Sequence, residues 1–322
     1  MRIARWTGDT GDHEGIVVDG SVIPFLDGTR VSEVLAGGLA AALELGARTA
    51  EARLGALPLA EVTLRAPLDP VTVRDFVAFE EHVEGVVKSV DNSEGVVPEW
   101  YEYPTFYFTN PHMITATGET VTPPLSQRLD FELELGAVIG GVEGSDGRNL
   151  SPEGAHPHIF GYTIFNDWSA RDVQAREMKV RLGPCKGKDF ATTLGPWIVT
   201  ADEFEELHDD EGFLPIVMSV EVNGVEVGRD LFSNMGWPFA ELVAYASRNS
   251  RVVPGDVLGS GTVGRGCLAE LWGRGSELPP LQPGDEVIMR VERIGEIRNV
   301  VGEPVEVPHI PAARQRSRAR SR

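Results

Sequence analysis

The sequence predicts an α+β protein rich in β-strands, with a small α/β domain at its N-terminus. After Pro70, glycine and proline recur between short runs of Val, Ile and Leu, a pattern typical of strands joined by long loops. Before Pro67, a hairpin-like segment is combined with one long Ala- and Leu-rich stretch that favours a helix. The chain lacks the regular alternation of strand and helix patterns that indicates a doubly wound parallel sheet.

Residues 1–66 are expected to form the small domain. The dipeptide Asp19-Gly20 is a strong hairpin turn between two apolar runs. Residues 32–57 favour a helix, with interruptions near Gly37-Gly38 and Gly46, because glycine lowers helix propensity.

The prolines of the Pro67-Leu68-Asp69-Pro70 run mark a boundary, so we expect a larger second domain over residues 67–310. Asn223-Gly224 predicts a further hairpin there. The stretches with the clearest helix patterns are residues 79–90, 170–180 and 238–247. Residues 311–322 form an Arg-rich tail that we expect to be disordered.

Composition argues against several classes of protein. The net charge of −20 argues against nucleic acid as a partner, because phosphate binding needs a positive surface. No stretch has the roughly 18 apolar residues of a membrane span, and the first residues lack an apolar signal core, so we expect a cytoplasmic protein without membrane contact. Cys185 and Cys267 form no metal-binding or disulfide pattern.

An acidic strand is the first candidate for chemistry. In Asp130-Phe131-Glu132-Leu133-Glu134, acidic and apolar residues alternate, so the three acidic side chains share one face of a strand. Taken alone, this pattern favours a half-exposed strand with a solvated acidic face over a metal site. Carboxylates that must stay close and ionised, however, repel each other unless a cation lies between them. A hard, oxygen-preferring ion such as Mg²⁺, Mn²⁺ or Ca²⁺ would suit such a site.

A second stretch adds another carboxylate. An apolar run from Phe160 leads into Asn166-Asp167, which places Asp167 at the end of a strand, where ligands often collect. Arg171 and Gln174 follow, three residues apart on one face of the expected helix. The alternative for Asp167 is a simple turn residue.

Two glycine-rich stretches do not support nucleotide binding. The stretch from Gly183 to Thr193 resembles a phosphate loop, but the glycine spacing is short and Asp189 replaces the required Ser or Thr. Residues 259–264 match G-x-G-x-x-G, but no strand–helix–strand unit surrounds them.

These motifs together resemble the fumarylacetoacetate hydrolase family. The Glu-x-Glu strand, the Asn-Asp-Trp-Ser-Ala-Arg-Asp-x-Gln run from Asn166, and the Gly-Lys-Asp-Phe-Ala-Thr-Thr-Leu-Gly-Pro-Trp loop from Gly187 occur in the family's order. The resemblance covers about residues 70–308. It implies a mixed β-sheet roll around a metal site, and residues 1–66 then resemble the small accessory domain of many members.

The resemblance also implies roles for individual residues. It places the metal ligands at Glu132, Glu134, Asp167 and Asp75. It places catalytic roles at His82, its partner Glu270, and Lys188. It places substrate binding or charge stabilisation at Arg171, Gln174, Gly261 and Thr262. Val77 and Met178 stand where the family's namesake enzyme has substrate-contacting tyrosines, so fumarylacetoacetate itself is not carried over as the substrate.

The activity implied is metal-dependent hydrolysis of a C–C bond in a β-diketo or acylpyruvate-type acid. In that reaction His82 activates water, and the metal and Lys188 stabilise an enolate. The same enolate chemistry leaves open decarboxylation of an oxaloacetate-type acid and isomerisation of a 2-hydroxyhepta-2,4-diene-1,7-dioate-type acid. A metal-stabilised binding protein without turnover is the remaining alternative. The family resemblance also implies a homodimer.

Overall fold

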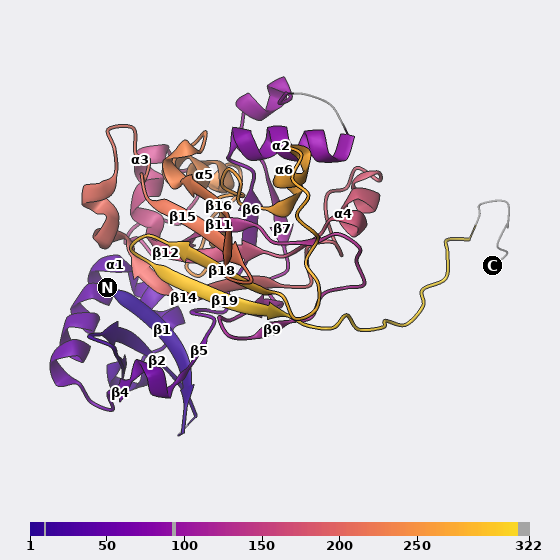
Figure 1. Cartoon of the computed structure of the whole chain (residues 1–322). Helices are drawn as coiled ribbons and strands as arrows, with labels where there is room; N and C mark the ends of the chain where they lie inside the picture. Colours follow the sequence, from indigo (N-terminus) through magenta and orange to yellow (C-terminus); the bar gives the residue numbers. More distant parts are fainter. Residues whose placement is uncertain (10, 92–94, 315–322) are drawn as a thin grey trace, which may run out of the picture.

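The computed structural model of the chain describes residues 1–9, 11–91 and 95–314 (Figure 1). Residues 10, 92–94 and 315–322, which include most of the Arg-rich tail, lie outside the described residues. The described part of the tail, up to Arg314, is exposed and runs away from the body of the molecule (Figure 1).

A mixed 12-stranded sheet forms the frame of the described structure. Ten strands follow one another across it: β4 (Leu57–Pro58), β3 (Ser21–Pro24), β2 (Gly11–Val18), β1 (Arg2–Gly8), β14 (Thr192–Thr200), β12 (Ile159–Asp167), β11 (Leu133–Ile139), β17 (Val257–Gly259), β6 (Val73–Phe76) and β7 (Phe106–Thr109). Two more pair with them from the side: β5 (Thr63–Arg65) with β1, and β8 (Ile114–Thr115) with β14.

Two smaller sheets complete the β-structure. A five-stranded sheet has the order β16 (Val225–Leu231), β15 (Val217–Val222), β18 (Glu286–Val291), β19 (Gly295–Val301) and β9 (Thr120–Val121). A two-stranded sheet pairs β10 (Leu129–Asp130) with β13 (Ser169–Ala170). The predicted β-rich α+β fold is therefore confirmed.

In the described part of the chain the helices are fewer than the strands, and α1 (Val31–Ala52) is the longest of them. The other α-helices are α2 (Glu80–Asp91), α3 (Pro152–Ala155), α4 (Arg171–Met178), α5 (Phe239–Ser247) and α6 (Leu268–Gly273). The 3₁₀ turns are η1 (Leu26–Gly28), η2 (Leu59–Glu61), η3 (Pro98–Tyr101), η4 (His156–His158), η5 (Ala201–Leu207) and η6 (Phe232–Asn234). Helices α2 and α6 pack against each other, which matters for the site below (Figure 1).

Local predictions from turn residues are largely confirmed. Asp19-Gly20 joins β2 to β3, and Asn223-Gly224 joins β15 to β16. The predicted N-terminal helix is α1, which is interrupted at Gly38 (φ 80°). The interruption expected at Gly46 is wrong, because helical geometry continues there to Ala52.

The acidic strand differs from the prediction. It is divided into β10 and β11, with Phe131 and Glu132 between them. Both faces are buried, because Asp130 and Glu134 are as inaccessible as Phe131 and Leu133. The reading of this stretch as a solvated acidic face is therefore wrong.

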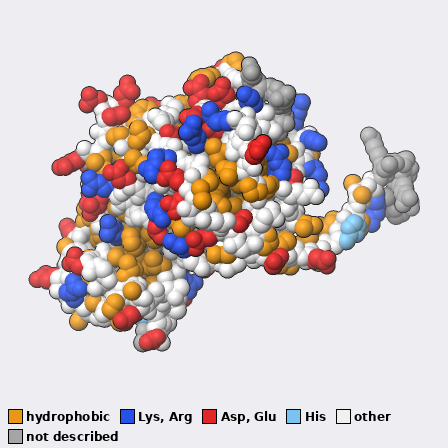
Figure 2. Space-filling model, in the orientation of Figure 1, with side chains coloured by type: hydrophobic (Ala, Val, Ile, Leu, Met, Phe, Trp, Pro, Cys, Tyr) orange, Lys and Arg blue, Asp and Glu red, His pale blue; other side chains and the backbone are white. Residues whose placement is uncertain are grey.

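The N-terminal strands continue the large sheet, because β1 pairs with β14 in antiparallel register. Because this pairing joins the two predicted domains in one sheet, the domain boundary near residue 66 stays a prediction. Acidic and basic side chains are interspersed over the face shown in Figure 2. Among the described residues, no helix combines the length and apolar character needed to cross a bilayer.

Candidate metal centre and active site

Four carboxyl groups meet inside the large sheet. Glu134 belongs to β11, Asp167 ends β12, Asp75 lies in β6, and Glu132 lies just before β11. All four are at most 4% exposed. Asp75, Glu132 and Asp167 each offer an oxygen, and these three oxygens lie within 4.8 Å of one another. The sequence-predicted metal ligands are therefore brought together.

Gly259 makes this approach possible. Its strand, β17, lies between β11 and β6, with Gly259 opposite Asp75. A Cβ atom at Gly259 would lie 2.6 Å from Asp75 Oδ1 and 3.0 Å from Glu134 Oε2. Because it has no side chain, the carboxyl groups of Asp75 and Glu134 can come together across the middle strand.

The loop after β17 holds Glu134 in place. The Gly261 backbone N–H donates to Glu134 Oε2 at 3.0 Å, and Thr262 Oγ1 lies 3.4 Å from Glu134 Oε1. Gly261 has φ 80°, and a Cβ there would lie 2.6 Å from the Phe76 carbonyl oxygen. In this structure Gly261 and Thr262 thus contact a predicted metal ligand.

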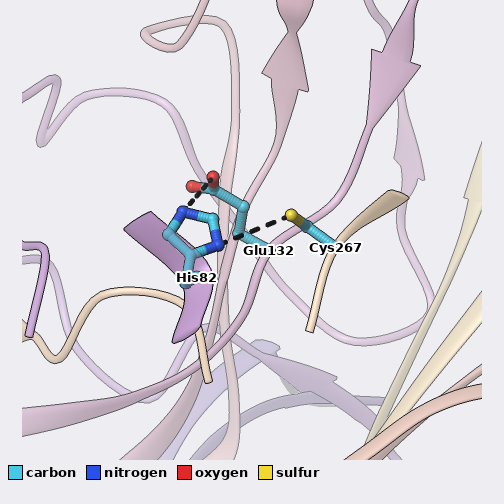
Figure 3. A group of neighbouring side chains, drawn as sticks. All are labelled: His82, Glu132 and Cys267. Carbon is cyan, nitrogen blue, oxygen red and sulfur yellow. Dashed lines mark hydrogen bonds and ion pairs between the residues drawn. The ribbon is translucent and has the colours of Figure 1, made fainter. Parts of the chain in front are cut away.

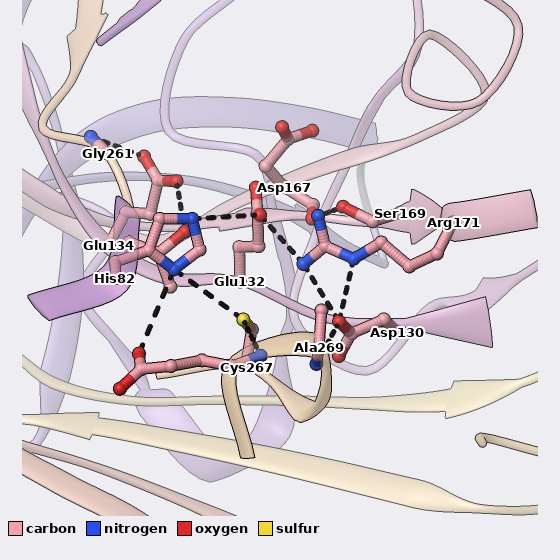
Figure 4. Close-up of polar contacts among 12 residues, drawn as sticks. His82, Asp130, Glu132, Glu134, Asp167, Ser169, Arg171, Gly261, Cys267 and Ala269 are labelled. Atoms are coloured by element: carbon pink, nitrogen blue, oxygen red, sulfur yellow. Dashed lines mark hydrogen bonds and ion pairs between the residues drawn. The ribbon is translucent and has the colours of Figure 1, made fainter. Parts of the chain in front are cut away.

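Two cations face the carboxyl groups. Lys188 Nζ binds both Glu132 Oε2 and Asp167 Oδ2, the latter at 2.6 Å. Arg171 NH2 lies 2.8 Å from Glu132 Oε1, while its Nε donates to Asp130 Oδ2 at 2.8 Å (Figure 4). Because Asp130 shares the charge of Arg171, two cations face five buried carboxyl groups, and negative charge remains in excess.

The charge imbalance appears in the pKa values. Burial, and then the charge of Asp167, raises the pKa of Asp75 well above its usual range. Burial and then Asp75 raise the pKa of Glu134 in the same way, and burial also raises the pKa of Asp167. Burial acts in the same direction on Glu132, but Arg171 and Lys188 outweigh it and lower the pKa of that group.

The residues present fit a hard divalent cation. Asp167 Oδ1 is buried and has no hydrogen-bond partner in the described part of the chain, whereas the Asp75 carboxyl is hydrogen-bonded to Glu134, another acid. Buried polar atoms are normally paired, and two carboxyl groups can share a hydrogen bond only while one of them keeps its proton, so these oxygens suit a cation. Mg²⁺, Mn²⁺ and Ca²⁺ all prefer such oxygen ligands.

His82 borders the carboxylate cluster. It lies in α2 and is 6% exposed. Its Nε2 is 3.8 Å from Glu132 Oε1, and its Nδ1 is 3.8 Å from Glu270 Oε2 in α6. Gly85 permits this arrangement, because a Cβ there would lie 2.3 Å from Glu270 Cγ.

Glu270 is itself held by two donors. Its Oε2 accepts from the Arg265 backbone N–H at 2.7 Å, and its Oε1 accepts from Arg274 Nε at 2.9 Å. Cys267 begins α6, and its Sγ lies 3.6 Å from His82 Nδ1. His82 thus lies between Glu132 and Cys267 (Figure 4), and Glu270 is a third neighbour on the Nδ1 side.

The remaining predicted site residue, Gln174, is half-buried and contacts Arg171, whose NH1 donates to Gln174 Oε1 at 3.2 Å. Sequence reasoning missed Tyr107 in β7, whose hydroxyl donates to Asp167 Oδ2 at 2.6 Å. Burial, and then Asp167, raises the pKa of that hydroxyl well above its usual range, so it remains a donor. Sequence reasoning also missed the role of Gly259, although this residue is the first glycine of the G-x-G-x-x-G match rejected as a nucleotide site.

Known proteins share both the sequence pattern and the fold. The family described as fumarylacetoacetate (FAA) hydrolase C-terminal matches residues 72–302. The fumarylacetoacetase of Arabidopsis thaliana is 32% identical over 265 residues, which span 68% of this chain and 62% of that protein. The chain thus spans less than two thirds of that relative's length.

Solved structures show the same architecture. A fumarylacetoacetate hydrolase from Exiguobacterium antarcticum is 25% identical, with TM-score 0.66 over 94% of this chain and 99% of that one. A maleylpyruvate hydrolase from Sphingobium sp. SYK-6, solved with manganese(II) and pyruvate, is 20% identical, with TM-score 0.68 over 95% of this chain and all of that one. The second similarity establishes the fold alone.

The mixed sheet and its buried carboxylate cluster define a class of β-rich proteins with a site suited to a divalent cation. The chain belongs to the fumarylacetoacetate hydrolase family, since the family match covers most of its length. The named relatives are enzymes, which confirms the prediction of an enzyme family.

Proposed function

We propose that this chain is a divalent-metal-dependent hydrolase that cleaves a C–C bond in a β-diketo or acylpyruvate-type acid. One observation supports this most strongly: the buried imidazole of His82 lies between Glu132 of the carboxylate cluster and Glu270. A base beside an electrophilic centre, with a carboxylate behind it, is the arrangement that water activation needs.

Asp75, Glu132, Glu134 and Asp167 would hold the ion, which we propose to be Mg²⁺, with Mn²⁺ or Ca²⁺ as alternatives. When bound, the ion would polarise the oxygens of a chelating oxo acid and stabilise negative charge that develops on them.

His82 would take a proton from water at Nε2 as the water oxygen attacks the carbonyl carbon. Glu270 would orient the ring and stabilise its charged form through Nδ1, because it lies on that side of the imidazole. The 3.8 Å separation exceeds a hydrogen bond, so the two side chains would have to move closer to form one. Breaking the C–C bond then yields a carboxylic acid and an enolate, which is protonated to the oxo acid.

Lys188 and Arg171 would handle the negative charge of substrate and product. The Lys188 ammonium group is buried among carboxylates, and although burial alone opposes protonation, Asp167 and Glu132 raise its pKa. It therefore stays charged and can stabilise an enolate oxygen. Gln174 fixes the outer nitrogen of Arg171 and would orient it toward a substrate carboxylate.

The base favours hydrolysis over decarboxylation. Decarboxylation of an oxaloacetate-type acid needs no activated water, so His82 and Glu270 would have no catalytic role in it. The substrate we propose is a small oxo-carboxylic acid like fumarylpyruvate. Fumarylacetoacetate is less favoured, because Val77 and Met178 offer no phenol hydroxyl.

Oxygen-18 labelling tests the proposal. Metal-free protein is supplied with Mg²⁺ or Mn²⁺ in labelled water, together with acetylpyruvate, fumarylpyruvate or oxaloacetate. We expect one labelled oxygen in the carboxylic acid product, and loss of the reaction on adding EDTA. Release of CO₂ from oxaloacetate without labelled acid from any diketo acid would replace hydrolysis with decarboxylation.

A further inference from the structure

Cys267 is a buried side chain that the proposed reaction does not use. It is inaccessible to solvent and lies at the first turn of α6, where its Sγ accepts from the Glu270 backbone N–H at 3.4 Å. Burial, and then the charge of Asp130, raises the pKa of the thiol well above its usual range, so it carries its proton in the metal-free protein. A structural cap alone would not require sulfur, since Ser is the common residue for that task.

The surroundings of Cys267 provide two more metal ligands. His82 from α2 and Glu132, which lies just before β11, each offer an atom, and with Sγ these lie within 4.8 Å of one another. Figure 3 shows His82 between the other two side chains. All three residues are buried and come from separate elements of the fold.

The spacing matches a tetrahedral zinc site. Zn–S and Zn–N bonds of about 2.3 and 2.0–2.1 Å at the tetrahedral angle separate sulfur from nitrogen by about 3.5 Å. Cys267 Sγ and His82 Nδ1 are 3.6 Å apart. An ion could therefore bind both atoms with little rearrangement. Glu132 Oε1 lies 3.8 Å from the other ring nitrogen, Nε2, so its carboxylate would have to turn toward the ion to complete the site together with water.

We propose that Cys267, His82 and Glu132 form a second metal site, selective for thiophilic divalent ions such as Zn²⁺, at which binding blocks the imidazole of His82. Sulfur and imidazole favour Zn²⁺ and Co²⁺, whereas the all-oxygen cluster of Asp75 and Asp167 favours harder ions. Binding replaces the S–H bond by an S–metal bond, and the proton leaves to solvent.

Glu132 belongs to both ligand sets, so the two sites are coupled. An ion in the oxygen cluster competes for Glu132 and repels a second cation, so saturating Mg²⁺ should weaken Zn²⁺ binding. Metal binding at Cys267 does not depend on the proposed reaction, but its inhibitory effect rests on the proposed function, in which His82 is the base.

Cobalt absorption tests binding directly, and the chain contains its own control. Cys185, the other cysteine, is exposed and can be changed separately. The full-length metal-free wild type, C267S and C185S are titrated with Co²⁺ in the presence of Mg²⁺. We expect a thiolate-to-cobalt charge-transfer band for wild type and C185S and none for C267S. A band that persists in C267S, or no band in wild type, would overturn the proposal.

A second measurement avoids the variants. Wild-type protein is alkylated slowly with and without Zn²⁺, and both cysteines are quantified by mass spectrometry. We expect Zn²⁺ to slow alkylation of Cys267 at least about tenfold and to leave Cys185 unchanged, because a bound thiolate is not free to react. Equal rates at Cys267 with and without Zn²⁺ would contradict the site even if C267S fails to fold.

Inhibition separates this inference from the proposed function. With an active substrate, Zn²⁺ should inhibit wild type at least about tenfold more strongly than C267S, each compared with its own uninhibited rate. A cobalt band without turnover of any diketo acid would keep the site and refute the proposed function. Turnover without the band would do the reverse.

Discussion

Replacing Asp75 by Asn should make the protein more stable than wild type without metal and less stable than wild type with metal. Asp75 is buried, and the charges of Asp167 and Glu132 add to the effect of burial on it. Its folded-state pKa lies above the unfolded value of about 3.9. Asn has nearly the same shape but no charge, so the change leaves the packing against Gly259 intact.

The sign without metal follows from proton linkage. A raised folded pKa means that stability falls as pH rises above the unfolded pKa, by about 1.4 kcal/mol per pH unit, until the folded pKa is passed. At pH 7.5 the wild type has therefore lost stability that D75N keeps. In EDTA, D75N should be more stable than wild type by more than about 1 kcal/mol.

Added Mn²⁺ should reverse this order. At about 100 times Kd the ion stabilises wild type by about 2.7 kcal/mol. D75N has lost a charged ligand and should gain far less. Urea unfolding, followed by the fluorescence of buried tryptophans such as Trp168, measures all four free energies.

Asp256 provides the matched control. It is buried, but it accepts from Thr72 Oγ1 at 2.7 Å and from the Val253 N–H at 3.0 Å, away from the cluster. Because Asp256 Oδ2 also lies 3.6 Å from the buried Arg74 guanidinium, D256N should lose about 3–5 kcal/mol, equally with and without Mn²⁺. If D75N were destabilised by the same amount in both conditions, as D256N is, the metal assignment of Asp75 would be refuted.

Three further changes probe the site and the assembly. H82N should lower kcat about 10²–10⁴-fold in steady-state assays while Mn²⁺ binding is retained, because it removes only the base; wild-type kcat would contradict that role. G259A should cost about 1–3 kcal/mol and weaken Mn²⁺ binding in calorimetry, because its Cβ meets Asp75, whereas G136A on the adjacent strand should bind Mn²⁺ normally. We also expect a homodimer in light scattering and its dissociation by F108R, because Phe108 on the edge strand β7 is 63% exposed; a wild-type monomer would contradict this.

The sequence predicts most of what local patterns determine. Turn dipeptides such as Asn223-Gly224 locate hairpins, because few other residues accept the required backbone angles. The end of the apolar run correctly places Asp167 at the end of a strand. These features depend on neighbouring residues, so they can be recognised without knowing the fold.

Features that depend on distant partners were not predictable from pattern. The break between β10 and β11 accompanies Asp130 accepting the backbone N–H groups of Leu268 and Ala269, which are far away in sequence. The role of Gly259 depends on strand order, which places β17 between the strands that carry Asp75 and Glu134. Neither partner can be identified from local spacing.

The most direct test of the account is a titration of metal-free protein with Mn²⁺, in which electron paramagnetic resonance counts bound ions while turnover of a diketo acid is followed in parallel. In the wild type, turnover should rise in proportion to binding of the first ion. D75N should need a much higher Mn²⁺ concentration both to bind the ion and to turn over substrate. Turnover in the absence of a bound ion, or tight binding that D75N leaves unchanged, would contradict the account.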